Sequence, residues 1–197
     1  FNNHPIFKAH SYKPKRPFLF GLGTVLPKKN FHVLPCLLQG NDFELIIAGI
    51  DSSPYKARIA EEAKRFNVED RLTFTGPVSE DEKTWYYMNC QAFLFPSIAE
   101  GFGLPVIEAM YYGKPVFIST HTSLPEVGGE HAYYFKDFSA ETIQRSFEAG
   151  MNHYQRVQPE ELIKKWALRF DWANTARSYL EIYPSLVRGV AQHYYIF

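Results

Sequence analysis

The chain has 197 residues, which suits one domain with a substantial core. Its 21 lysines and arginines balance 21 aspartates and glutamates, so charge gives no reason to expect nucleic acid or an anionic membrane as the main partner. No apolar run approaches the roughly 20 residues that a membrane-spanning helix needs. Cys36 and Cys90 lie in apolar segments, which favours two buried, reduced thiols over a disulfide.

The first 17 residues are polar and contain three prolines, which is typical of a linker. Because the chain begins with Phe1 and not with methionine, we expect more protein upstream. The domain itself is expected over 18–187, followed by a tail at 188–197.

From Pro17 onward, short apolar runs alternate with amphipathic stretches. The predicted strands are Phe18–Leu22, Phe43–Ala48, Leu72–Thr75, Ala92–Phe95, Val116–Ser119 and Ala132–Phe135. The predicted helices are Asn30–Leu38, Pro54–Phe66, Ser79–Asn89, Pro105–Tyr112, Ala140–Asn152, Pro159–Phe170 and Trp172–Leu186. Strands that are apolar on both faces and separated by helices indicate an α/β, Rossmann-like, doubly wound parallel sheet of about six strands, with extra C-terminal helices.

In such a sheet, ligands bind beyond the carboxyl ends of the strands. The segment 96–110, PSIAEGFGLPVIEAM, follows a strand and opens a helix. Gly101 and Gly103 allow a ligand to approach the backbone, and the amides at the start of the helix form a site for an anion. A carboxylate beside a phosphate would repel it, so Glu108 is expected to accept hydrogen bonds from neutral hydroxyls, such as a ribose diol. Glu100, before the turn, is expected to contact a sugar.

The first strand is followed by GLGTVLPKKN, 21–30, in which Lys28 and Lys29 could neutralise a diphosphate. Its Gly21 and Gly23 also begin the dinucleotide pattern G-x-G-x-x-G. The third position is Leu26, however, and a bulky residue there blocks close packing of strand and helix, which argues against a nicotinamide or flavin site.

Two further loops have weaker patterns. In TGPVS, 75–79, the backbone near Val78 could pair with a base edge while Tyr86 flanks the ring. In STHTSLPE, 119–126, polar groups could close over the site, and His121 is a weak candidate for an acid or base. No cluster of cysteine and histidine has metal-ligand spacing, and neither a nucleophile elbow nor a Walker A pattern occurs.

At these residues the chain resembles the C-terminal, donor-binding domain of retaining GT-B glycosyltransferases of the family 4 type, over Phe18 to about Tyr183. The strongest element is the E-x7-E motif, Glu100 to Glu108, preceded by FLFPS and followed by YYGKPVFIS. The family fold pairs two Rossmann-like domains, so this chain would be one half of it. The first 17 residues then resemble the interdomain linker, and the last helix resembles the one that crosses back to the N-terminal half.

The resemblance implies a role for each matching residue. Glu100 would contact the donor sugar at the reacting centre, Lys29 would bind the diphosphate, and Glu108 would hold the ribose. Glu100 and Lys29 are the expected catalytic residues. The expected donor-binding residues are Gly23, Thr24, Lys28, Lys29, Val78, Ser97, Gly101, Phe102, Gly103, Leu104 and Glu108. The implied substrate is a UDP- or GDP-linked sugar, without metal or other cofactor.

One residue departs from the pattern. Many members have an arginine directly after the glycine of the first loop, where this chain has Thr24. Similar loops occur in mannosyltransferase-like members, which favours a GDP-sugar. The resemblance also implies a glycan or lipid-linked acceptor, which would bind to an N-terminal domain. The full-length protein would lie in the cytoplasm or at the inner face of the membrane, with peripheral membrane association. The alternatives are a non-catalytic nucleotide-sugar-binding or interaction module of the same fold, or a GT-B epimerase or phosphorylase. No pyridoxal-phosphate lysine site is recognisable for the last of these.

Overall fold

The computed structural model describes residues 12–51 and 53–191, of which 184–191 are described as backbone only. Six parallel strands form one sheet: β1 (Phe18–Leu22), β2 (Glu44–Ala48), β3 (Leu72–Gly76), β4 (Ala92–Phe95), β5 (Val116–Ser119) and β6 (Tyr133–Phe135). Their order is β3-β2-β1-β4-β5-β6, which confirms the predicted doubly wound sheet. The order reverses between β1 and β4, so the loops after these two strands lie side by side.

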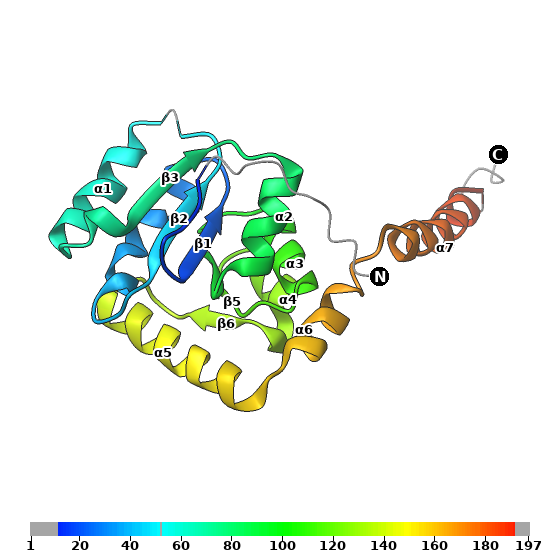
Figure 1. Cartoon of the computed structure of the whole chain (residues 1–197). Helices are drawn as coiled ribbons and strands as arrows, with labels where there is room; N and C mark the ends of the chain where they lie inside the picture. The colour runs from blue at the N-terminus through cyan, green and yellow to red at the C-terminus, as the bar shows by residue number, and fades with distance from the viewer. Residues whose placement is uncertain (1–11, 52, 192–197) are drawn as a thin grey trace.

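Helices cover both faces of the sheet (Figure 1). They are α1 (Tyr55–Arg65), α2 (Glu80–Asn89), α3 (Leu104–Tyr111), α4 (Leu124–Gly128), α5 (Ala140–Val157), α6 (Glu160–Ala167) and α7 (Trp172–Ala191). Side chains alternate along each strand, so Leu19 packs with α1 and α5 in one core, while Phe20 packs with α2, α3, α4 and α6 in the other. Cys36 and Cys90, one in each core, are buried free thiols, as predicted.

Two connections differ from the prediction. The stretch Asn30–Leu38 forms no α-helix but part of a run of three 3-10 turns, Pro27–Lys29, Phe31–Val33 and Pro35–Leu38. Pro35 has no amide hydrogen to donate, and Asn30 adopts a left-handed conformation with φ 58°, so a continuous helix is interrupted. The loop expected at 119–126 contains the start of α4, with Pro125 in its first turn.

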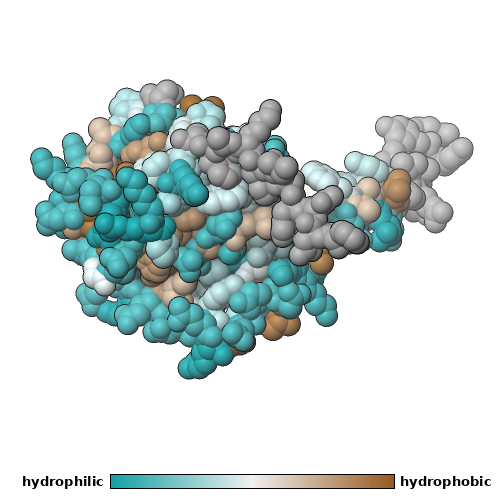
Figure 2. All heavy atoms as spheres, viewed as in Figure 1, coloured by the Kyte–Doolittle hydropathy of each residue, from teal (hydrophilic) through white to brown (hydrophobic). Residues whose placement is uncertain are grey.

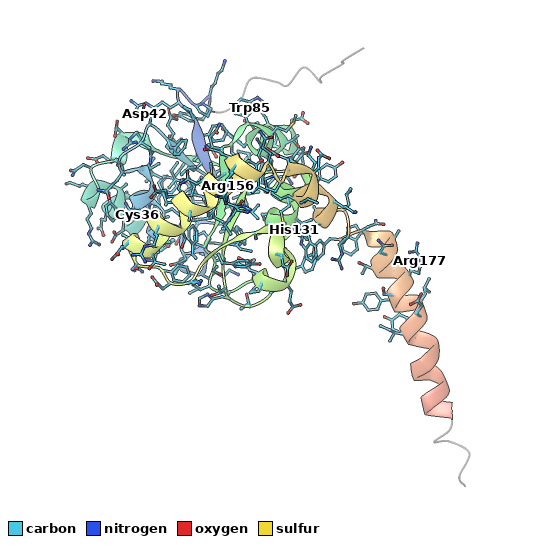
Figure 3. The ribbon with its side chains drawn as sticks, turned by 90° about the horizontal axis from the view of Figure 1, so that it is seen from below. Cys36, Asp42, Trp85, His131, Arg156 and Arg177 are labelled. Atoms are coloured by element: carbon cyan, nitrogen blue, oxygen red, sulfur yellow. The ribbon has the colours of Figure 1, made fainter. Side chains whose placement is uncertain are left out.

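The long helix α7 projects away from the body in two views (Figures 1 and 3). Its large apolar side chains are exposed, and Figure 2 shows apolar atoms among its spheres. Trp172 is 81% and Leu180 69% exposed. The helix predicted at Trp172–Leu186 continues to Ala191, and a single glycine, Gly189, does not end it. Residues 192–197 lie outside the described part of the chain.

The expected linker, 1–17, is described only from Tyr12 onward. This end packs on the sheet, since the hydroxyl of Tyr12 donates to Oε2 of the buried Glu44 at 2.8 Å. The hydroxyl of Tyr86 in turn donates to the carbonyl of Tyr12 at 2.8 Å. Residues 12–17 therefore lie against the domain they precede.

Candidate active site

The turn between β4 and α3 places the uncapped N-terminus of α3 at the carboxyl edge of the sheet. Gly103 precedes α3 with φ 107°, a left-handed conformation, and no side chain caps the helix. This backbone conformation favours glycine, and a Cβ at Gly103 would also lie 2.9 Å from Cδ2 of Leu124. A helix that begins without a cap leaves its first amides available to a ligand, and its dipole favours an anion there.

Lys29 and Glu100 form an ion pair between the two loops at the reversal of strand order. Nζ of Lys29 lies 2.6 Å from Oε1 of Glu100, and each side chain is 12% exposed. The same ammonium lies 4.5 Å from the centre of the Phe95 ring. Gly23 makes room for this arrangement, because a Cβ there would lie 3.0 Å from Cε of Lys29. The two predicted catalytic residues are thus brought together.

Ser97 fixes the carboxylate of Glu100 from the protein side. Its hydroxyl lies 2.5 Å from Oε1 of Glu100 and 3.0 Å from the carbonyl of Lys28, and the residue is fully buried. Ser97 is one of the expected donor-binding residues. In this structure its hydroxyl bonds within the protein, where it orients Glu100. Lys28 contributes its carbonyl to the loop, while its side chain is exposed.

The last residue of β5 and the loop after it hold the β4–α3 turn with three hydroxyls. The amide of Glu100 donates to Oγ1 of Thr122 at 3.1 Å, and Ser123 donates to the carbonyl of Phe102 at 2.9 Å. Ser119 donates to the carbonyl of Ser97 at 2.5 Å. Thr122 is held in the left-handed region with φ 51°, which is unusual for a β-branched residue. The sequence pattern indicated polar groups in this loop but not that they support the turn.

Glu108 lies one turn into α3, where two residues of α2 hold its carboxylate. Nζ of Lys83 lies 3.1 Å from Oε1, and the hydroxyl of Tyr87 donates to Oε2 at 2.9 Å. The carboxylate side chain is 37% exposed. It lines a cavity of about 530 Å³ between α2, α3 and the end of α6. Sequence reasoning missed Lys83 and Tyr87, although their spacing of four residues places both on one face of a helix.

The ionisation of these neighbours suits a carboxylate that accepts hydrogen bonds. Burial, and after it the charge of Glu108, raises the pKa of Tyr87 well above its usual value, so the phenol stays protonated. Burial by itself lowers the pKa of Lys83, but hydrogen bonds to Glu80 and Glu108 outweigh it and raise this pKa. Lys83 is therefore a cation at neutral pH.

The remaining candidates are placed as follows. Phe102 and Leu104 are exposed, with Phe102 edge-on to Phe170 at 5.9 Å between ring centres, and the side chain of Val78 packs partly buried on the core. Tyr86 is fully buried, so its ring cannot flank a base as expected. His121 is exposed and its ring stacks on Phe138 at 5.6 Å. Thr24 is partly buried and Gly101 exposed.

Within the described residues, no group of three or more His, Cys, Asp and Glu side chains could hold a metal ion. The helices of that part of the chain include none that is long and apolar enough to cross a membrane.

The fold and this site define an α/β domain built to present a helix N-terminus and carboxylates at a strand-order reversal. Residues 3–166 match the family described as Glycosyl transferases group 1. The chain therefore belongs to the group 1 glycosyl transferases. The serotype-specific mannosyltransferase WbdA of Escherichia coli is 31% identical over 183 residues, covering 87% of this chain and 22% of that protein. The O-antigen chain mannosyltransferase B of Escherichia coli is 33% identical over 118 residues, covering 55% of this chain and 30% of that protein.

Solved glycosyltransferase structures share the fold. A glycosyltransferase from Rickettsia africae superposes with a TM-score of 0.76 at 18% identity, covering 89% of this chain and 49% of that one. Alr3699/HepE of Anabaena in complex with UDP-glucose superposes with a TM-score of 0.70 at 20% identity, covering 87% and 49%. This chain thus spans about half the length of these structures and about a fifth of the length of WbdA.

Proposed function

We propose that this chain is the C-terminal, donor-binding half of a retaining GT-B glycosyltransferase of the family 4 type. The observation that supports it best is the arrangement of Glu100 and Glu108 on either side of the uncapped start of α3, with Lys29 against Glu100. In a nucleotide sugar, a neutral sugar, a diphosphate and a neutral ribose follow one another. The site presents a carboxylate, a helix N-terminus with a cation, and a second carboxylate in the same order.

In this proposal, the amides of Gly103 and Leu104 and the ammonium of Lys29 take up the charge that develops on the leaving diphosphate. Glu100 orients the donor sugar and stabilises oxocarbenium character at its anomeric carbon, and Ser97 keeps the Glu100 carboxylate in place. Gly23, Thr24, Lys28, Gly101 and Phe102 complete the donor site, and the backbone at Val78 meets the base. The anomeric configuration of the sugar is retained in the product.

The donor we favour is a GDP-linked hexose such as mannose. Two relatives are named mannosyltransferases, and Thr24 replaces the arginine that many members have in this loop. The acceptor, a glycan or a lipid-linked glycan, would bind to an N-terminal domain, with 1–17 as the linker between the halves. The full protein would work in the cytoplasm or at the inner membrane face, in polysaccharide or glycoconjugate biosynthesis.

A thermal-shift titration with UDP, GDP and ADP tests donor binding. A nucleotide at 100 times its dissociation constant should stabilise the chain by about 2.7 kcal/mol. In the full-length protein, Glu108→Ala should abolish transfer. The proposal fails if no nucleotide raises the midpoint and Glu108→Ala leaves transfer intact. If a nucleotide binds but the full-length wild-type protein transfers no sugar, the domain is a non-catalytic binding module.

A further inference from the structure

The carboxylate of Glu108 is held at both oxygens by side chains that donate hydrogen bonds. Tyr87 donates to Oε2 and Lys83 to Oε1, and both come from consecutive turns of α2. An ionised carboxylate has about four lone-pair sites, two on each oxygen. One site on each oxygen is therefore used by the protein, and one on each oxygen remains.

The two donors are themselves fixed. The Tyr87 ring is 1% exposed and packs on Phe20, Phe93 and Tyr112, with ring centres 5.4, 5.3 and 6.0 Å away. Lys83 is only 18% exposed and also binds Oε2 of Glu80 at 2.7 Å. Tyr87 cannot turn away from Glu108 without leaving these buried ring contacts, and Lys83 is held between two carboxylates. The orientation of the carboxylate is thus set by α2 before any ligand arrives.

We propose that Tyr87 and Lys83 are positioning residues that set Glu108 to accept two hydrogen bonds from the vicinal hydroxyls of a ribose. This inference rests on the proposed function, in which Glu108 holds the ribose. The two remaining lone-pair sites match the two donors of the diol, and the exposed side of the carboxylate faces the cavity. The arrangement should make the site discriminate ribonucleotides from 2′-deoxyribonucleotides.

Tyr86 offers a matched control on the same helix. It is also fully buried, and its hydroxyl also donates one hydrogen bond, but to the carbonyl of Tyr12 and not to Glu108. Tyr86→Phe and Tyr87→Phe each remove one buried hydroxyl from α2. Only Tyr87→Phe should change the preference of the chain for ribonucleotides over 2′-deoxyribonucleotides.

The test is calorimetric titration of the chain with GDP and 2′-deoxy-GDP, and with UDP and 2′-deoxy-UDP. The wild type should prefer the ribonucleotide about tenfold, because hydrogen bonds to a charged group are the stronger ones. Tyr87→Phe should reduce this preference to about threefold, with little change in affinity for the 2′-deoxy compound. Tyr86→Phe should keep the wild-type ratio, and Glu108→Gln should abolish it.

The outcomes separate this inference from the proposed function. The positioning role is wrong if Glu108→Gln abolishes the preference while Tyr87→Phe keeps it. It is also wrong if Tyr87→Phe lowers the affinity for both nucleotides equally. In either case the proposed function stands. If the wild type shows no preference or binds no nucleotide, the ribose role of Glu108 itself fails. Circular dichroism checks that each variant folds. If the Tyr87→Phe variant does not fold, Lys83→Met is tested instead, by the same ratio of affinities for the ribonucleotide and the 2′-deoxyribonucleotide. An unchanged ratio would overturn the inference.

Discussion

The ammonium of Lys29 lies 2.6 Å from Oε1 of Glu100, across 71 residues of sequence. The contact joins the loop after β1 to the loop after β4, at the point where the strand order reverses. Each partner thus sits where a ligand would enter, and a diphosphate would compete with Glu100 for the ammonium. The pair therefore links the phosphate end of the proposed site to its sugar end.

Removing Lys29 should affect both stability and activity. Lys29→Met leaves the Glu100 carboxylate, which is largely buried, without its cation. We therefore expect the free energy of unfolding to fall by about 1–3 kcal/mol. In the full-length enzyme, kcat should fall about a hundredfold, as for loss of one group that stabilises developing charge. Urea unfolding and a transfer assay measure the two effects. The double variant Lys29→Met/Glu100→Gln should regain part of the stability but none of the activity. Additive losses of stability would contradict the pairing.

Gly103 and Gly101 should respond differently to alanine. Gly103 has φ 107° and a Cβ there would lie 2.9 Å from Cδ2 of Leu124, so Gly103→Ala should destabilise the chain by about 1–3 kcal/mol and weaken nucleotide binding. A Cβ at Gly101 meets no atom within 4 Å, so Gly101→Ala should stay within about 0.5 kcal/mol of the wild type. Parallel urea titrations decide, and equal losses in both variants would show that the turn is not strained at Gly103.

Some elements of the fold and of the candidate site follow from the sequence, and others do not. The strands were predicted almost residue by residue, because a buried parallel strand is apolar on both faces. The apolar pattern predicts a helix at Asn30–Leu38, but Pro35 lacks the amide hydrogen that a continuous helix needs there, and 3-10 turns form instead. The E-x7-E motif predicts a candidate site, and the strand order brings Lys29 to Glu100. The contacts of Tyr87 and Ser123 depend on how helices and loops pack in three dimensions, so no local pattern indicated them.

The buried thiols should make the chain sensitive to alkali. Burial raises the pKa of Cys36 and of Cys90 from the usual 9.0 to about 12. Below pH 9 both the folded and unfolded states are protonated, and this contribution to stability is fully present. Between pH 9 and 12 the unfolded state loses its protons first, so the free energy of unfolding should fall by up to about 1.4 kcal/mol per pH unit for each thiol. Cys90→Ala should flatten this decline in urea titrations from pH 8 to 11. An unchanged slope would contradict the burial of the thiol.

The exposed side chains of α7 should promote self-association of the chain. Trp172, Tyr179, Leu180 and Tyr183 are between 54% and 81% exposed, which is unusual for large apolar residues on one helix. Light scattering should show an average mass that rises with protein concentration. Leu180→Glu should reduce that rise, whereas Glu181→Gln on the same helix should not. A mass that stays at that of one chain at high concentration would show that this surface does not associate.

We propose that a nucleoside diphosphate binds where α3 begins, between Glu100 and Glu108. The decisive measurement is amide chemical-shift mapping of the isotope-labelled chain during titration with GDP and UDP. The largest shifts should fall on Gly103, Leu104 and the loop carrying Lys29, and Glu108→Gln should weaken the binding that these shifts report. Shifts confined to other loops, or none with any nucleotide, would contradict it.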